Sequence, residues 1–102
     1  MREKRVIQAT VTMAMPPQKS GEALRIFKSF AERCRDEPGC ISCHLYEDLQ
    51  EKNVFMLKEM WRSEGDLDRH LCSEEYRNLL LILEMALKQP EIRFDTISSS
   101  TG

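Results

Sequence analysis

Two runs of alternating apolar and polar residues, 40–49 and 54–61, lie on either side of the polar stretch 50–53. Successive side chains of a strand point to opposite faces, so the pattern predicts a β-hairpin with a short polar turn. The second run is apolar on both faces, with Val54, Met56 and Met60 on one and Phe55, Leu57 and Trp61 on the other. A strand of this kind needs cover on both faces, which limits the folds open to the chain.

The segment before the hairpin predicts one strand and one helix. Residues 5–14 are rich in β-branched side chains, which favour a strand. From about Ser20 the apolar residues recur every three or four positions, as in an amphipathic helix of about five turns. Pro38 and Gly39 end this helix immediately before the hairpin.

The segment after the hairpin predicts a broken helix and a last strand. Ser63 is a good N-cap, and Asp66 is placed to reach back to it. Ser73 gives a second helix start, so we expect two helical pieces, the second extending to Pro90. Residues 92–97 alternate again and read as a strand. The order β-α-β-β-α-β predicts an α+β, ferredoxin-like antiparallel sheet with its helices on one face.

The other face of this sheet has no helix left to cover it. A large bare apolar face is unusual on a monomer, so we expect two copies to pack sheet on sheet as a homodimer. Lys58 interrupts the face, although its aliphatic stem can lie along apolar surface. The predicted organisation is a single domain over 1–102, ordered from about 5 to 97, with a flexible tail at 98–102.

The composition argues against several partners. The 102 residues carry a net charge of −2, which gives no general attraction to nucleic acid or to an anionic membrane. No stretch approaches the roughly 20 apolar residues of a membrane span, and the charged start lacks the apolar core of a signal peptide. We therefore expect a cytoplasmic protein whose four cysteines are reduced thiols.

The candidate site is the junction between the second hairpin strand and the following helix. Trp61, the only tryptophan, and His70, one of two histidines, lie nine residues apart across this junction and can converge on one pocket wall. An imidazole there can act as a general base toward a substrate hydroxyl. The structural alternatives are a core indole and a satisfied core or surface histidine.

Three polar side chains form a second tier of candidates. His44 and Tyr46 share a face of the first hairpin strand and would line the same cavity if pairing brought them beside Leu57 and Trp61. The alternative is a cross-strand packing pair. Glu59 shares a strand face with Trp61, and we expect it at the rim of the cavity, paired with an arginine, or else in a catalytic role.

The cysteines favour no metal or redox site. Cys40 and Cys43 form a C-x-x-C, but on a strand positions three apart point to opposite faces. Cys34 and Cys72 are expected to be buried thiols on helix faces. No cofactor and no metal are predicted.

Several segments together resemble the antibiotic biosynthesis monooxygenase (ABM) domain family. They are Glu37-Pro38-Gly39-Cys40, Leu45-Tyr46-Glu47-Asp48, Glu59-Met60-Trp61-Arg62-Ser63-Glu64, Leu67-Asp68-Arg69-His70-Leu71 and Ser73-Glu74-Glu75-Tyr76. The resemblance covers about residues 6–97. It implies a dimeric α+β barrel with a pocket between the helices and the sheet. Better-known members oxidise quinols or polyphenols with O₂ and without metal or flavin, and relatives include haem-degrading oxygenases and an isomerase of a phosphorylated sugar.

The resemblance carries over residue by residue. Trp61 matches the tryptophan of the quinone-forming members, and His70 matches the helix histidine of quinol-monooxygenase-like and isomerase-like members. Leu57 stands where the quinone-forming members have an asparagine near the substrate oxygen, and it cannot form a hydrogen bond. Leu80 stands where haem-degrading members have their axial histidine, which argues against haem.

These observations favour a cofactor-independent monooxygenase that acts on a quinol or another small phenol. Trp61 would stack on the ring, His70 would take the hydroxyl proton, and Tyr46, His44, Glu59 and Leu57 would line the pocket. Two alternatives stay open: an isomerase that moves a proton in a small metabolite, and a non-catalytic dimeric module that binds a small molecule.

Overall fold

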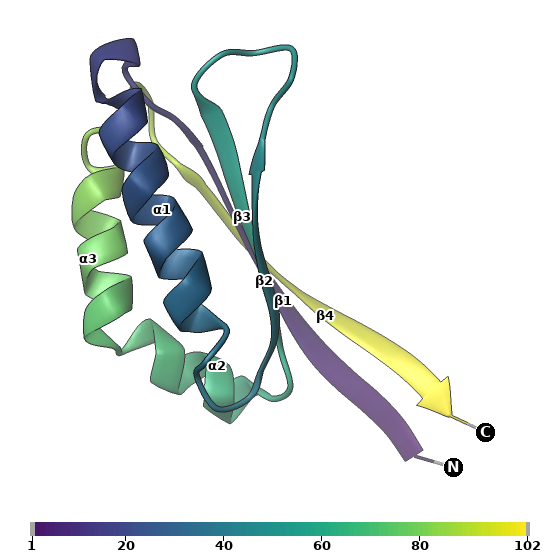
Figure 1. Ribbon diagram of the computed structural model, residues 1–102. Helices are drawn as coiled ribbons and strands as arrows, with labels where there is room; N and C mark the ends of the chain where they lie inside the picture. The colour runs from purple at the N-terminus through teal and green to yellow at the C-terminus, as the bar shows by residue number, and fades with distance from the viewer. Residues whose placement is uncertain (1, 102) are drawn as a thin grey trace.

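The computed structural model describes residues 2–101, and the surroundings of their side chains from residue 5 to residue 97. Its elements are β1 (Arg2–Ala14), the short 3₁₀ turn η1 (Pro17–Lys19), α1 (Ser20–Cys34), β2 (Cys40–Glu47), β3 (Val54–Trp61), α2 (Glu64–Leu71), α3 (Glu74–Leu83) and β4 (Glu91–Thr101). The strands pair antiparallel in the order β2-β3-β1-β4, and the helices cover one face of the sheet (Figure 1). This is the ferredoxin-like α+β fold that the order of elements predicts.

Burial along β3 alternates as the sequence predicts. Phe55, Leu57, Glu59 and Trp61 are buried under the helices, whereas Val54, Met56, Lys58 and Met60 are half-buried on the opposite face. The same open face carries Tyr46, which is 46% exposed, and Ile97, which is 39% exposed. None of the described helices lies over this face (Figure 1).

The connection from α1 to β2 brings the hairpin close to α2. Gly39 has a φ of 86°, a left-handed conformation that side chains with a Cβ rarely adopt. A Cβ at this position would also collide with the side chain of Asp66 in the first turn of α2. The carbonyl oxygen of Gly39 accepts a 2.8 Å hydrogen bond from the backbone N–H of Arg62, just before α2. These contacts place the end of α1 next to the junction between β3 and α2.

Both predicted serine caps are present. The hydroxyl oxygen of Ser63 accepts from the backbone N–H of Asp66, and the Ser63 hydroxyl donates to the Asp66 carboxylate over 2.8 Å. Ser73 caps α3 in the same way by accepting from the backbone N–H of Tyr76. The break between α2 and α3 therefore lies where the sequence predicts it, because each serine satisfies an N–H that the helix cannot.

Helix α3 is shorter than predicted. It ends at Leu83, not near Pro90, because the chain then turns back toward the sheet. The backbone N–H of Leu87 donates to the carbonyl oxygen of Ala14 at the end of β1 over 2.8 Å. Within residues 2–101 no helix is both long and apolar enough to cross a bilayer.

Strands β1 and β4 are longer than predicted. Residues 98–101 continue β4 and pair with residues 2–5 of β1, so the expected flexible tail is wrong for these four positions, and Gly102 lies outside the described residues. This pairing is made by backbone hydrogen bonds, which do not require alternating apolar side chains. The sequence of residues 98–101 therefore gives no sign of a strand. Figure 1 shows β1 and β4 running past the helices to the two ends of the chain.

Candidate active site

The two rings at the junction of β3 and α2 lie against each other. Trp61 is the last residue of β3 and His70 lies in the last turn of α2, and both are fully buried. Their ring centroids are 4.5 Å apart with 32° between the planes. Phe30 and Tyr76 complete the surroundings of the imidazole, with ring centroids 5.5 and 5.4 Å from it. Trp61 and His70 meet as expected, but they meet in a tightly packed cluster and do not form the wall of the groove described below.

Glu59 is central to this cluster, which corrects the expectation of a rim carboxylate paired with an arginine. The antiparallel register turns it toward the helices, where it is 1% exposed. Its Oε1 accepts a 2.8 Å hydrogen bond from Nε1 of Trp61. Nε2 of His70 approaches the same oxygen to 3.1 Å, without the alignment of a hydrogen bond.

A second carboxylate holds the other side of the imidazole. Oε2 of Glu37, in the turn after α1, lies 2.8 Å from Nδ1 of His70. The Glu37 side chain is 25% exposed, so it connects the buried ring with the surface. Its partner is 33 residues away in the chain, and nothing local to Glu37 indicates the contact.

The two carboxylates determine the direction in which the pKa of His70 shifts. Burial alone lowers the pKa of an imidazole, but Glu59 and Glu37 outweigh it and raise the pKa of His70 above its ordinary value. Burial, together with the negative charge of Glu59, also raises the pKa of the Tyr76 phenol. The two carboxylates therefore favour the protonated imidazole of His70, and burial favours the neutral phenol of Tyr76.

Three other predicted residues lie elsewhere. His44 and Tyr46 pair with Lys58 and Met56 and so face the open side of the sheet, which makes the expected shared cavity with Trp61 wrong. Their rings lie 6.2 Å apart, as a packing pair would. Leu57 is fully buried on the helix side and brings no polar group to the cluster.

The cysteines depart from the predicted pattern as well. A β-bulge between Cys40 and Ser42 breaks the alternation, so Cys40 and Cys43 pair with Trp61 and Glu59 on the same face of the sheet. The Sγ of Cys34, at the end of α1, lies 3.8 Å from the Sγ of Cys40. Cys72 is exposed in the turn between α2 and α3, not buried.

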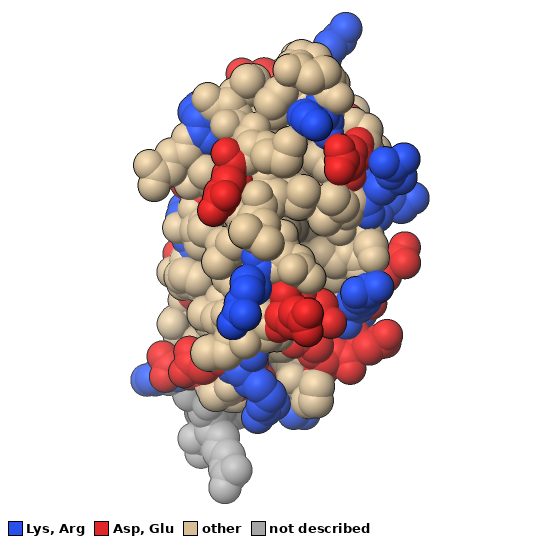
Figure 2. All heavy atoms as spheres, turned by 90° about the vertical axis from the view of Figure 1, so that its left-hand side faces the viewer, with Lys and Arg blue, Asp and Glu red and all other residues tan. Residues whose placement is uncertain are grey.

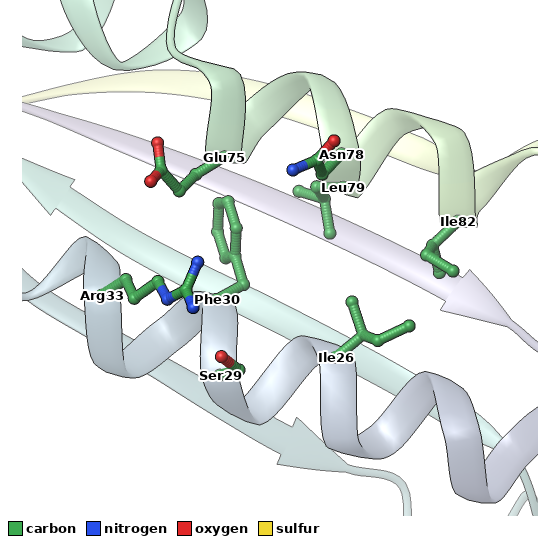
Figure 3. A pocket seen from close by; sticks show the side chains of 8 residues that line it. All are labelled: Ile26, Ser29, Phe30, Arg33, Glu75, Asn78, Leu79 and Ile82. Carbon is green, nitrogen blue, oxygen red and sulfur yellow. The ribbon is translucent and has the colours of Figure 1, made fainter.

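A groove between α1 and α3 lies just outside the buried cluster. Its volume is about 280 Å³, and it is lined by Ile26, Ser29, Phe30, Arg33, Glu75, Asn78, Leu79 and Ile82. Arg33 and Glu75 stand at one end and Ile26 and Ile82 at the other (Figure 3). Trp61 and His70 do not line this groove, but Phe30 both lines it and packs on His70. Figure 2 faces this helical layer, where charged side chains of both signs are interspersed with broad uncharged areas.

Comparison with protein-family models shows to which family this chain belongs. The family model described as antibiotic biosynthesis monooxygenase (ABM) matches residues 6–80. The chain belongs to the ABM family. The matched span includes Trp61, His70 and both carboxylates that hold the imidazole.

Two solved structures and one curated relative are also similar to this chain. A conserved protein from Methanosarcina mazei Go1 is 28% identical, with a TM-score of 0.81 over 88% of this chain and 90% of its own. Protein SO0527 from Shewanella oneidensis has a TM-score of 0.84 over 97% and 100% of the two chains, and at 14% identity it supports the fold alone. The uncharacterized protein sll1783 from Synechocystis sp. is 44% identical over 54 residues, which are 53% of this chain and 37% of that protein.

This ABM chain has leucine at position 57 and a buried glutamate at position 59. The resemblance places a polar side chain at position 57, four residues before the tryptophan, where this chain has leucine. Glu59, two residues before Trp61, is the carboxylate that contacts the indole N–H here. Strand residues two apart share a face, so Glu59 and Trp61 reach the same site from one strand.

Proposed function

We propose that this ABM-family protein is a cofactor-independent monooxygenase that oxidises a quinol or another small phenol with O₂. The observation that carries the proposal is the imidazole of His70, held between Glu37 and Glu59 and packed against Trp61. The neutral form of His70 can receive a proton at Nε2, which has no aligned hydrogen bond, and both carboxylates stabilise the positive charge that forms.

The substrate would enter through the groove between α1 and α3. Small-ligand sites are commonly about 300–1,000 Å³ and mostly apolar, so a groove of about 280 Å³ suits a compact aromatic ring. Phe30 separates this groove from His70. In the proposed complex the Phe30 ring swings aside and the substrate ring takes its place against the imidazole. Arg33, Asn78 and Glu75 at the groove offer polar partners for ring substituents.

The proposed reaction needs no added reductant. Removal of the hydroxyl proton by His70 makes an electron-rich phenolate, which can give an electron to O₂ directly. One oxygen atom enters the ring and the other leaves as water, whose two hydrogens come from the hydroxyl group and the ring carbon. A phenol and O₂ thus become a quinone and water. The protein contributes orientation, proton removal and exclusion of water.

Oxygen uptake with a panel of quinols and naphthols tests the proposal. We expect O₂ consumption and quinone formation in equal amounts with at least one free phenol. The matched methyl ether should not react, because it has no hydroxyl proton to lose. Turnover of the ether at the same rate, or no oxygen consumption with any phenol in a broad panel, would contradict the monooxygenase.

Proton-transfer isomerisation is the second candidate, and the placement of Glu59 beside His70 favours it. A carboxylate and an imidazole 3.1 Å apart can remove and return a proton without any oxygen. Product formed at an equal rate under strictly anaerobic conditions would select the isomerase over the monooxygenase. A ligand that binds tightly and is recovered unchanged would instead select the non-catalytic module.

We also propose that two copies pack through the open faces of their sheets. The support is the bare apolar surface around Met56 and Met60, which no described helix covers. We expect Met56→Glu to turn the dimer into monomers at micromolar concentration, because it buries a charge in the shared sheet interface. Sedimentation velocity measures this directly.

The matched control for the dimer is Leu81→Glu. Leu81 is another exposed apolar residue, 56% exposed, but it lies on α3 at the helical side of the sheet. This variant should sediment as the unmodified protein does. A well-folded monomer of the unmodified chain at micromolar concentration would overturn the sheet-to-sheet dimer.

A further inference from the structure

Sulfur and carboxylate ligands gather where α1 meets the hairpin, in a cluster that shares Glu59 with the proposed reaction and adds two thiols that the reaction does not use. The Sγ atoms of Cys34 and Cys43 and a carboxylate oxygen of Glu59 all lie within 4.8 Å of one another. Cys43 and Glu59 are paired across β2 and β3, and Cys34 reaches them from the last turn of α1. All three side chains are buried, with exposures of 1%, 0% and 1% for Cys34, Cys43 and Glu59.

Glu59 has an unused ligand atom in this buried place. Its Oε1 accepts a hydrogen bond from the indole N–H of Trp61. Its Oε2 is buried and has no hydrogen-bond partner among the described residues. A buried carboxylate oxygen normally has a partner, because its desolvation is otherwise uncompensated. A carboxylate oxygen of Glu59 lies within 4.8 Å of the thiols of Cys34 and Cys43, and a cation bound by all three side chains would compensate the unpartnered oxygen.

We propose that Cys34, Cys43 and Glu59 form a binding site for a zinc ion. Two thiolates and one carboxylate suit Zn²⁺, whereas calcium and magnesium take oxygen ligands only. Zinc–ligand bonds of about 2.0–2.3 Å in a tetrahedron place ligand atoms roughly 3.3–3.8 Å apart. The ligand atoms here lie within 4.8 Å of one another, so small side-chain rotations bring them to these distances. The three protein ligands leave the fourth zinc position open.

The surroundings are suited to binding and to entry of the metal. The guanidinium of Arg35 donates from Nε to the backbone carbonyl of Cys43 over 2.8 Å, which holds this part of β2 against the end of α1. The partly exposed thiol of Cys40, 3.8 Å from Cys34, connects the cluster with the surface. Binding converts two thiols into zinc-bound thiolates and releases two protons to solvent. The zinc would join α1 to the hairpin and fix Glu59 against Trp61, and no step of the proposed oxidation takes place on it.

Metal content and cobalt spectroscopy test this site without any substrate. The full chain is purified with a reductant and without chelator or metal-affinity resin. We expect close to one zinc per chain by elemental mass spectrometry. After the zinc is removed, Co²⁺ should bind with the sulfur-to-cobalt charge-transfer absorption that thiolate ligands give. Zn²⁺ should then displace the cobalt and abolish this absorption.

The variants compare cysteines inside and outside the cluster. Cys34→Ser and Cys43→Ser should each weaken zinc binding by more than about 100-fold. Loss of a residue that only supports a ligand costs about 10–100-fold in affinity, and loss of the ligand itself costs more. Cys72→Ser, at the exposed cysteine outside the cluster, should bind zinc as the unmodified chain does. Alkylation of the unmodified protein in moderate urea, where the buried thiols become accessible, gives a measurement independent of how the variants fold. Mapped by mass spectrometry, zinc should slow the alkylation of Cys34 and Cys43 and leave that of the exposed Cys72 unchanged.

Three results would overturn the zinc site. One is a reduced protein that takes up neither Zn²⁺ nor Co²⁺. Another is alkylation of Cys34 and Cys43 at the same rate with and without zinc. The third is zinc affinity that falls as far in Cys72→Ser as in Cys34→Ser. None of these results bears on oxygen uptake, so the zinc site and the proposed function can fail separately.

Discussion

Replacing Trp61 with alanine should lower the free energy of unfolding by about 3–5 kcal/mol, the usual cost of deleting a buried aromatic side chain. The indole is fully buried against His70, and its N–H donates a hydrogen bond to Oε1 of Glu59. The variant therefore leaves a cavity and also removes a partner from a buried carboxylate. Because small domains are stable by only about 5–15 kcal/mol, we expect unfolding at much lower urea concentration.

Urea unfolding followed by far-ultraviolet circular dichroism checks this expectation, since the variant has lost the only tryptophan and its fluorescence. Trp61→Phe is the matched control. It keeps an aromatic ring in the site and deletes the N–H, so it should cost about 1–3 kcal/mol, the penalty of an unsatisfied buried acceptor. An alanine variant within about 1 kcal/mol of the unmodified protein would contradict the packing described for this ring, since deleting a buried tryptophan ordinarily costs several times more.

Local signals in the sequence were sufficient for most of the fold. The alternation along β3 and the serine caps at Ser63 and Ser73 depend on neighbours a few residues away, and the structure has all of them as predicted. The length of β4 could not be predicted in this way. Residues 98–101 pair with the start of β1 through backbone hydrogen bonds, which any side chain permits.

The candidate site was predictable only in part, because its contacts join distant segments. Trp61 and His70 flank one junction, and their meeting follows from the order of the elements. Alternation alone says which residues share a face but not which face the helices cover. It therefore allows His44 and Tyr46 either beside Trp61 or in a packing pair, and the register turns them away from Trp61. The bulge after Cys40 changes the facing of one cysteine, and no residue type near it indicates a bulge.

Glu37 shows most clearly what a single sequence leaves out. Its contact with His70 depends on the left-handed turn at Gly39, which carries the end of α1 to the junction of β3 and α2. The turn residues are visible in the sequence, but the direction in which they send the chain depends on the packing of α2 against it. The carboxylate is therefore found only when the three-dimensional arrangement is known.

Replacing His70 with glutamine should lower the turnover of a responsive quinol by about 10²–10⁴-fold, the contribution typical of a positioned general base. Glutamine can still donate a hydrogen bond toward Glu37 and occupies a similar volume, but it cannot accept a proton at neutral pH. The loss should therefore fall on kcat much more than on KM, because glutamine fills a similar volume beside the bound ring but cannot take the proton. Initial rates of oxygen uptake over a range of quinol concentrations measure both constants.

Arg69→Gln is the control matched to this change, since it introduces the same residue at the preceding position of the same helix. The Arg69 side chain is 64% exposed and its ion pair with Asp66 lies at the surface, where such pairs contribute little. This variant should keep the unmodified kcat. Circular dichroism and sedimentation of both variants establish that fold and assembly are unchanged, so that the rate reports on the chemistry. Full activity in a folded His70→Gln protein would remove His70 from the reaction and with it the central step of the proposed oxidation.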